Sequence, residues 1–339
     1  MIDTDNMVKK SMNLFTEQIK DSFEKSLGII LPNEYQQVKN IVACGMGGSR
    51  FPHYIVKELF KEEISVPYLI NDDYNLPGFV DDNTLVILSS YSGTTEEILA
   101  VGKKAYEKKA KIIGISDGGE LKEFLENIKA PGYFFDPVYN PSGQPRIGFG
   151  YLIGGIMGLL SNLKVLNLHK DSIITAINNV KIPEIEKEAE QIAKKIFNKY
   201  PYYIVSEFLT GVGNAIANQT NETAKSISSF RVIPELNHHL MEGLKNPNEL
   251  KRISIFIFFF SKLFSSSIQK RFIITKEIVE KNNIETLWYE LKGKNKVEQV
   301  LELMILGNFL TMNLSTLYGE NPMTVPYVDY FKKKLKEVT

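Results

Sequence analysis

The sequence has little of several features that define whole classes of protein. Its 339 residues include one cysteine, Cys44, so no disulfide can form within the chain and a disulfide-stapled secreted fold is excluded. Its 40 basic residues balance 40 acidic ones, which argues against a general nucleic-acid binder, because such affinity comes mostly from neutralised phosphates. No stretch reaches the ~18 consecutive apolar residues of a membrane helix, and Met1–Lys20 lacks the apolar core of a signal peptide. We expect a cytoplasmic protein with no nucleic-acid and no membrane partner.

The first half of the chain alternates short runs rich in valine and isoleucine with longer amphipathic runs. This alternation predicts a parallel β-sheet with helices on both faces, whose ligands bind at the carboxyl ends of the strands. The expected strands are Asn40–Cys44, Pro67–Ile70, Thr84–Ser89 and Lys111–Ser116, and the expected helices are Phe51–Lys61, Thr95–Lys109 and Glu120–Lys129.

The second half begins with a glycine-rich apolar helix and a charged amphipathic stretch, and then repeats the strand–helix alternation. Its expected elements are the helix Gly148–Leu166, the connector Asp171–Asn198, the strand Tyr202–Phe208, the helix Gly213–Ser226, the strands Phe230–Pro234 and Arg252–Phe260, a further strand at Trp288, and the helices Val297–Leu317 and Val325–Glu337. At ~150 residues per domain, the length also suggests two domains. We predict an N-terminal domain over residues 20–150, a helical connector over 151–195 and a C-terminal domain over 196–339.

A glycine-rich turn follows the first expected strand. The sequence Gly-Met-Gly-Gly-Ser at residues 45–49 leads directly into a helix. Glycines there let backbone N–H groups approach an anion at the helix N-terminus. The spacing matches neither the P-loop nor the Gly-x-Gly-x-x-Gly pattern of dinucleotide-binding folds. Taken alone, this turn is either an anion cradle or a tight strand-to-helix connection.

A second turn concentrates hydroxyl groups at the end of another strand. It reads Ser-Tyr-Ser-Gly-Thr-Thr over residues 90–95, and an N-cap needs only one or two of these hydroxyls. Because both turns follow strands of one parallel sheet, they are expected at the same edge. Together they predict a phosphate site whose candidate residues are Gly47, Gly48, Ser49, Ser90, Ser92 and Thr95.

These two turns resemble those of the sugar isomerase (SIS) domain, a flavodoxin-like α/β/α sandwich that binds phosphosugars. The length and the two-domain layout narrow the resemblance to the bifunctional phosphoglucose/phosphomannose isomerases, which are built from two SIS domains and act as dimers. The resemblance runs from about residue 20 to the C-terminus and implies a phosphosugar substrate and a homodimer. Two positions depart from the family pattern: Thr94 replaces the usual asparagine, and Arg50 stands where a small residue is common.

Interconversion of an aldose and a ketose phosphate needs a carboxylate that moves a proton and a donor that stabilises the enediolate. Glu222, on an expected helix, could by itself be a solvated acid. Its surroundings, Asn-Glu-Thr-Ala-Lys, resemble the family element Asn-Glu-x-Ala-Lys, whose glutamate is the isomerising base. Arg146 lies in an apolar segment and needs an anionic partner, which could be a structural ion pair between domains. The segment resembles the family element Pro-Arg-x-Gly-Phe-Gly, which implies that Arg146 faces the substrate and stabilises the enediolate.

Histidine is scarce, with four in the chain, and His53 and His169 lie in unrelated contexts. His238 and His239 are adjacent, so on a helix they point ~100° apart and form a poor metal site. We therefore predict no metal and no cofactor. A neutral imidazole suits the opening of a sugar ring, although a plain surface pair is the simpler interpretation. The run Glu-Leu-Asn-His resembles the family element whose histidine enters the partner subunit's active site, which implies His238, with His239 as the alternative.

The C-terminal segment ends in a basic helix, whose lysines commonly compensate the helix dipole. The family carries one catalytic lysine on its last helix, and the pattern puts it at Lys332, with Lys333 and Lys334 as alternatives. Activity on mannose 6-phosphate requires rotation about C2–C3 of the enediolate. Family members carry a threonine that makes room for this rotation, and the resemblance implies Thr324 as the candidate. The proline that usually follows this threonine is displaced by one residue, because Val325 intervenes.

The sequence therefore predicts a metal-free isomerase of glucose 6-phosphate and fructose 6-phosphate, with mannose 6-phosphate as a further candidate, in glycolysis and gluconeogenesis. One alternative is a phosphosugar-sensing protein without turnover. It accounts for both turns but leaves Glu222, Arg146 and His238 unexplained. The other alternative is an amino-sugar phosphate isomerase.

Overall fold

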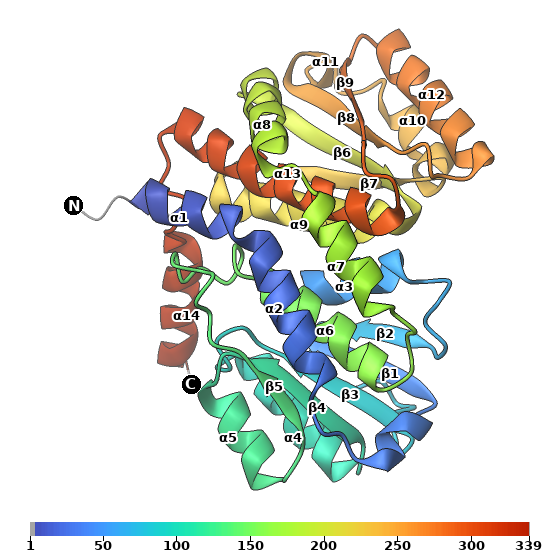
Figure 1. Ribbon diagram of the computed structural model, residues 1–339. Helices are drawn as coiled ribbons and strands as arrows, with labels where there is room; N and C mark the ends of the chain where they lie inside the picture. The colour runs from blue at the N-terminus through green and yellow to red at the C-terminus, as the bar shows by residue number, and fades with distance from the viewer. Residues whose placement is uncertain (1–3, 339) are drawn as a thin grey trace.

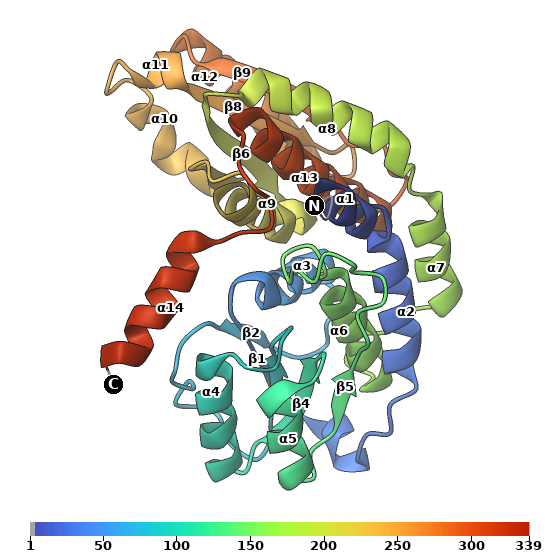
Figure 2. The same cartoon turned by 90° about the vertical axis from the view of Figure 1, so that its left-hand side faces the viewer.

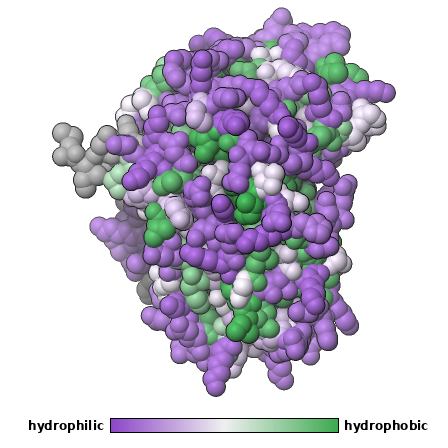
Figure 3. Space-filling view, viewed as in Figure 1, coloured by the Kyte–Doolittle hydropathy of each residue, from purple (hydrophilic) through white to green (hydrophobic). Residues whose placement is uncertain are grey.

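The computed structural model describes residues 4–338, so residues 1–3 and Thr339, the last residue of the predicted second domain, lie outside it. Two parallel sheets organise the chain, one in each half, and helices enclose both (Figure 1). The face seen in Figure 3 is mainly hydrophilic, with hydrophobic residues scattered over it. The expected fold class, an α/β protein with two three-layer parallel-sheet units, is confirmed.

The first sheet has five parallel strands in the order β2-β1-β3-β4-β5, which is the flavodoxin-like order. Every residue of β3 is buried because helices cover both faces, and this explains the uninterrupted apolar runs of the sequence. The strands are β1 (Asn40–Gly45), β2 (Tyr68–Asn71), β3 (Thr84–Ser89), β4 (Lys111–Ser116) and β5 (Gly132–Phe134). The short β5 was not among the expected strands.

Helices α3 (Phe51–Leu59) and α6 (Gly150–Asn162) lie on one face of this sheet, and α4 (Glu96–Glu107) and α5 (Gly119–Asn127) on the other (Figure 2). Helix α2 (Phe15–Leu27) packs along α6.

The glycines of α6 permit that contact. A Cβ at Gly154 would lie 2.1 Å from the Oγ of Ser22, and one at Gly158 would lie 1.9 Å from the Oγ of Ser26. Neither α2 nor the preceding α1 (Thr4–Asn13) was expected from the sequence.

The second sheet repeats the order of the first without its last strand, as β7-β6-β8-β9. Helix α9 (Thr210–Thr223) covers one face beside α13 (Lys296–Tyr318), and α12 (Ser266–Lys281) covers the other. The strands are β6 (Tyr200–Ser206), β7 (Ser229–Ile233), β8 (Ser254–Phe260) and β9 (Glu285–Glu290). The remaining α-helices are α7 (Lys170–Asn179), α8 (Ile182–Ile196), α10 (Leu240–Gly243), α11 (Leu250–Ile253) and α14 (Pro326–Val338).

Three expected elements need correction. The strand expected over Arg252–Phe260 begins at Ser254, because Arg252 and Ile253 belong to the short helix α11. The connector Asp171–Asn198 is two helices, α7 and α8, because Pro183 in the first turn of α8 favours a new helix start. The strand expected over Tyr202–Phe208 ends at Ser206, and Phe208 lies in a 3₁₀ turn. Helix α6, which belongs to the predicted connector, packs on the first sheet. The domain limits expected at residues 150 and 195 stay a prediction.

The two halves meet where α3 crosses α9. At Gly211 a Cβ would lie 2.6 Å from the backbone of Tyr54 and Ile55, so the helix backbones are nearly in contact. Helix α13 also lies in this region, against α8, α9 and α1. Among the described residues, α13 alone is long and apolar enough to cross a membrane, and most of it is buried inside the protein.

His53 on α3 is buried directly behind the first sheet's carboxyl edge. Its Nδ1 lies 2.6 Å from the Tyr68 hydroxyl and its Nε2 lies 2.7 Å from the Ser89 hydroxyl. Burial, helped by the charge of Arg50, lowers the pKa of His53 to about 3. The imidazole therefore stays neutral while it ties α3 to β2 and β3.

This burial predicts an acid-sensitive fold. An unfolded histidine takes up a proton below pH ~6.5 whereas folded His53 does not, so its contribution is complete above pH 6.5. Below that pH the free energy of unfolding falls by up to ~1.4 kcal/mol per pH unit until about pH 3.

Urea unfolding of wild type and His53→Gln between pH 7.5 and 4.5 tests this. We expect the variant to be less stable at pH 7.5 but to lose less stability on acidification, while the exposed control His169→Gln keeps the wild-type slope. Equal slopes for all three proteins would contradict the assignment.

Candidate functional site

The two predicted phosphate turns lie together at the carboxyl edge of the first sheet. Strands β1 and β3 are neighbours in register, with Gly45 opposite Ser89, so both turns begin at the same level. The hydroxyl of Ser49 accepts a hydrogen bond from the Tyr91 backbone N–H at 2.9 Å. The first turn is thereby fixed to the second.

The hydroxyls of the second turn are paired with one another. Ser90 Oγ lies 2.8 Å from Thr95 Oγ1, and Ser92 Oγ lies 2.9 Å from Thr94 Oγ1. Ser90 is buried, whereas Ser92 and Thr94 are exposed. Donors that can reorient are thus available both at the base and at the rim of the turn.

The segment around Arg146 packs closely against both turns. A Cβ at Gly48 would lie 3.5 Å from the backbone of Arg146, and one at Gly148 would lie 2.6 Å from the hydroxyl of Tyr91. Gly47, with φ +48°, has the left-handed backbone that glycine tolerates best. The structure thus brings Arg146 to the predicted cradle.

Arg146 is only 3% exposed and is surrounded by acceptors. Its Nη1 donates to Gln144 Oε1 at 2.9 Å and to Glu222 Oε1 at 3.3 Å, and its Nη2 donates to the carbonyl of Pro322. Its Nε is buried without a hydrogen-bond partner. Burial lowers the pKa of the guanidinium, and the carboxylates of Glu222 and Asp329 raise it again.

Glu222 reaches Arg146 from the last turn of α9. Most of α9 is buried, but Asn214, Asn218 and Glu222 are less so, and their four-residue spacing places them on one face of the helix. Arg50, which departs from the family pattern, spans from Asp72 (2.7 Å) to this face at Asn214 (3.2 Å).

Two buried residues behind the site were not expected from the sequence. Gln219 Nε2 donates to the backbone carbonyl of Arg146 at 3.0 Å and to Asn308 Oδ1 at 2.7 Å. These two hydrogen bonds connect the backbone of Arg146 to the middle of α13. A lone glutamine and a lone asparagine on helices carry no motif, so the sequence offered no signal for them.

The C-terminal segment passes over Arg146 and Glu222. Lys225, three residues after Glu222, donates from Nζ to the carbonyl of Asn321 at 2.6 Å, next to the carbonyl that Arg146 holds. Thr324, the candidate specificity residue, is exposed, and its hydroxyl donates to the same Asn321 carbonyl at 3.4 Å.

The structure does not bring every candidate to this place. His238 and His239 are exposed after β7, and within the described chain His238 forms no hydrogen bond or ion pair with Arg146 or Glu222. Lys332, Lys333 and Lys334 lie on α14, whose side chains are exposed over residues 326–337 and which extends away from both sheets (Figure 2). Among residues 4–338, no three His, Cys, Asp or Glu side chains are grouped so that they could hold a metal ion.

The equivalent edge of the second sheet is occupied by the chain itself. Glu207 follows β6 as Gly47 follows β1, at the start of a 3₁₀ turn and with a similar φ of +44°. Its Oε1 accepts hydrogen bonds from the N–H (3.1 Å) and the hydroxyl (2.7 Å) of Ser265, just before α12. A carboxylate therefore lies where the first half presents its glycine turn.

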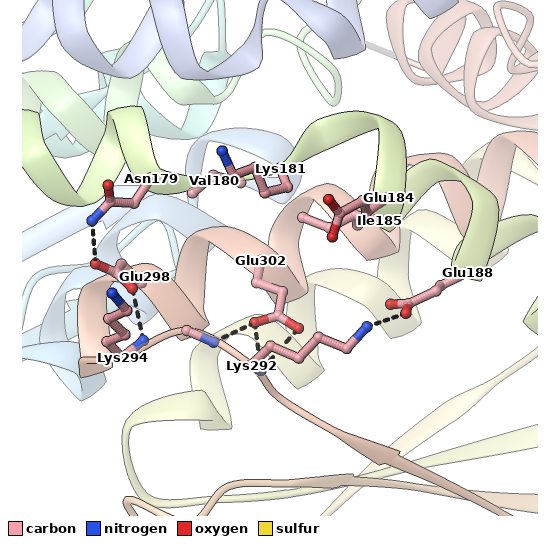
Figure 4. A pocket seen from close by; sticks show the side chains of 11 residues that line it. Asn179, Val180, Lys181, Glu184, Ile185, Glu188, Lys292, Lys294, Glu298 and Glu302 are labelled. Carbon is pink, nitrogen blue, oxygen red and sulfur yellow. Dashed lines mark hydrogen bonds and ion pairs between the residues drawn. The ribbon is translucent and has the colours of Figure 1, made fainter.

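A cavity of about 380 Å³ lies elsewhere, between α8, the start of α13 and the loop after β9 (Figure 4). Three of the four acids that line it, Glu188, Glu298 and Glu302, already have structural partners. Glu302 accepts from the N–H groups of Lys292 and Gly293 at 2.9 Å, and Glu298 accepts from that of Lys294 at 2.7 Å. Burial raises the pKa of Glu302, and these backbone donors lower it. These carboxylates fix the loop.

Comparison with known proteins identifies the class first. The fold is that of the C-terminal domain of glucosamine-fructose-6-phosphate aminotransferase from Francisella tularensis, with a TM-score of 0.73 at 12% identity over 93% of this chain and 98% of that one. Residues 185–335 match the family described as the bacterial phospho-glucose isomerase C-terminal SIS domain. The chain is therefore a protein of the SIS fold.

Curated relatives then give the family. A bifunctional phosphoglucose/phosphomannose isomerase of Caldicellulosiruptor bescii is 30% identical over 338 residues, which are 95% of this chain and 97% of that protein. A D-glucosamine-6-phosphate 4-epimerase of Sulfolobus acidocaldarius is 30% identical over 227 residues, 67% of this chain and 70% of that protein. The chain belongs to the bifunctional phosphoglucose/phosphomannose isomerase family.

The bond between the two turns makes a stability prediction. Ser49→Ala leaves the buried N–H of Tyr91 without an acceptor, so we expect it to lower the free energy of unfolding by ~1–3 kcal/mol. Ser92→Ala removes a hydroxyl that is exposed, so its effect should stay within ~0.5 kcal/mol. Urea denaturation of both variants compares them, and a Ser49→Ala variant as stable as Ser92→Ala would contradict this role.

Proposed function

We propose that this protein interconverts glucose 6-phosphate and fructose 6-phosphate through an enediolate, without a metal, and that mannose 6-phosphate is a further substrate. The observation that carries the proposal is the 3.3 Å contact between Arg146 and Glu222 beside the two turns. A phosphate cradle, a carboxylate and a buried cation lie within one cluster, as this reaction requires. The family of the chain supports the same activity.

In the proposed reaction the phosphate binds the hydroxyls and backbone N–H groups of the turns at Ser49, Ser90, Ser92 and Thr95. Glu222 removes the proton from C2 of the open-chain aldose and returns it to C1, while the proton of the C2 hydroxyl passes to O1. Arg146 stabilises the negative charge that develops on these oxygens. Because its guanidinium is buried, its attraction for that charge is screened less than it would be in water.

For mannose 6-phosphate, the enediolate must also receive its proton at C2 on the opposite face. This requires rotation about C2–C3 of the enediolate. We propose that the space for this rotation lies beside Thr324, which is next to the carbonyls that accept hydrogen bonds from Arg146 and Lys225. A relative named D-glucosamine-6-phosphate 4-epimerase gives a reason to assay amino-sugar phosphates beside the neutral sugars.

We further propose a homodimer in which His238 enters the partner's site and assists ring opening together with Lys332. His238 is exposed and forms no hydrogen bond or ion pair with Glu222 of its own chain, which supports a role in trans.

Helix α14 offers a surface for the second copy. Tyr327, Phe331 and Leu335 are exposed at four-residue spacing, and Asp329, whose charge reaches Arg146, lies on the opposite side of the helix. An apolar side that faces away from its own chain is suited to contact with another.

The isomerase activity that we propose, together with the single buried cysteine, favours a cytoplasmic enzyme of glycolysis and gluconeogenesis.

The activity is tested with fructose 6-phosphate as substrate. We expect purified protein to form glucose 6-phosphate at the same rate with and without EDTA, as a coupled assay measures. Glu222→Gln should lower kcat by ~10²–10⁴-fold, because the proton acceptor is lost, while calorimetry shows fructose 6-phosphate still bound.

Glu190→Gln, an exposed acid on α8, is the matched control and should retain full activity. Binding of fructose 6-phosphate by wild type without turnover would indicate a sensing protein. Turnover of glucosamine 6-phosphate alone would favour the amino-sugar alternative.

The role of His238 is tested by mixing inactive variants. Glu222→Gln and His238→Ala chains, once their subunits exchange randomly, should recover about a quarter of the wild-type activity, because half of the dimers are mixed and each then has one intact site. Glu222→Gln mixed with Arg146→Gln should recover none, since these two residues meet within one chain. Equal absence of recovery from both mixtures, with exchange verified, would count against a site shared between subunits.

A further inference from the structure

Residues 319–325, which we name the strap, connect α13 to α14 across the proposed site. Two consecutive carbonyls of the strap accept hydrogen bonds from two cations of the site. Arg146 Nη2 donates to the carbonyl of Pro322, and Lys225 Nζ donates to that of Asn321. Burial and the charge of Arg146 lower the pKa of Lys225, as expected for two cations brought close together.

Three of the five N–H donors of Arg146 have a partner. Nη1 donates to Gln144 and Glu222, and Nη2 donates once, to Pro322, which leaves the buried Nε and one N–H of Nη2 without a partner. An enediolate oxygen that binds this guanidinium therefore has to displace a partner or enter beside the buried Nε and Nη2. The guanidinium attracts the carboxylate of Glu222 more strongly than it attracts a neutral oxygen, so the neutral acceptors, Gln144 and the carbonyl of Pro322, are the partners more readily displaced by an anionic oxygen.

The three partners also differ in how firmly the fold holds them. Glu222 belongs to α9, which is packed against α3 and β6, and Gln144 is two residues from Arg146 itself. Pro322 is itself buried, but it belongs to a strap whose Met323 packs only partly into the core and whose Asn321 and Thr324 are exposed. Beyond the strap, the side chains of residues 326–337 are exposed. The strap is thus the partner that can move without disturbing a sheet.

We propose that the strap is a latch: Arg146 and Lys225 hold its carbonyls in the arrangement seen here, and the reacting oxygens of the bound phosphosugar replace the Pro322 carbonyl on Arg146, which releases the strap and repositions α14. Lys225 is then a positioning residue that acts through the strap. The inference rests on the proposed function, because it takes the sugar oxygens to bind at Arg146.

Hydrogen exchange of wild type, followed by mass spectrometry, tests the release. Saturating fructose 6-phosphate should speed exchange of the amides of residues 319–329, whereas saturating inorganic phosphate, which has no sugar oxygens to compete for Arg146, should leave them unchanged. Unchanged or slower exchange with fructose 6-phosphate, in protein that turns this sugar over, would overturn the latch and leave the proposed function standing. Protein that neither binds nor converts fructose 6-phosphate would overturn both.

The latch residue gives an independent test. Lys225→Met removes the donor to Asn321 but keeps the side-chain length, so the strap of this variant should exchange faster even without any sugar. Since the strap no longer competes as strongly, KM for fructose 6-phosphate should fall by about three- to tenfold with kcat retained. Lys225→Arg, which keeps a donor, should restore wild-type exchange and KM. A higher KM in Lys225→Met would show instead that Lys225 binds the sugar, and would overturn the latch.

Discussion

The arrangement depends on one buried positive charge. A guanidinium that is almost fully removed from water is costly unless acceptors surround it, and Arg146 has a carboxylate, an amide oxygen and a carbonyl in contact. Each acceptor comes from a different part of the chain. The charge therefore draws together the segment after β5, the end of α9 and the segment before α14. The backbone of the same residue closes the glycine turn after β1.

The two sheets repeat one topology, yet their carboxyl edges are used differently. The first half presents glycine after its first strand, and the second half presents Glu207 at the matching position. Because that carboxylate already takes the N–H and hydroxyl of Ser265, the start of α12 has an internal anion. The second half instead contributes Glu222, from the helix that follows this turn. In the function that we propose, the repeat divides the work, with anion-binding turns from one half and a proton-transfer group from the other.

Much of this could be predicted from local sequence, since valine- and isoleucine-rich runs stopped by glycine or serine define the strands and both turns. The elements that escaped prediction depend on distant parts of the chain. Helix α2 is specified by its contact with the glycines of α6, and the short β5 by pairing with β4. Gln219 and Asn308 acquire their role only when α9 and α13 pack together. Buried His53 belongs to the same group, because its partners lie on two strands.

Helix α13 shows how closely the halves depend on each other. It follows the last strand of the second sheet, yet it also packs against α1 and α3 from the first half of the chain. Its apolar surface, comparable to that of a membrane helix, is covered mainly by α8 and α9, and the contacts with α1 and α3 join it to elements more than two hundred residues earlier in the chain. All four of these helices are synthesised before α13, so the elements that cover it have already left the ribosome when it emerges. A circularly permuted chain that made α13 first would expose its apolar surface to aggregation until those helices had been made.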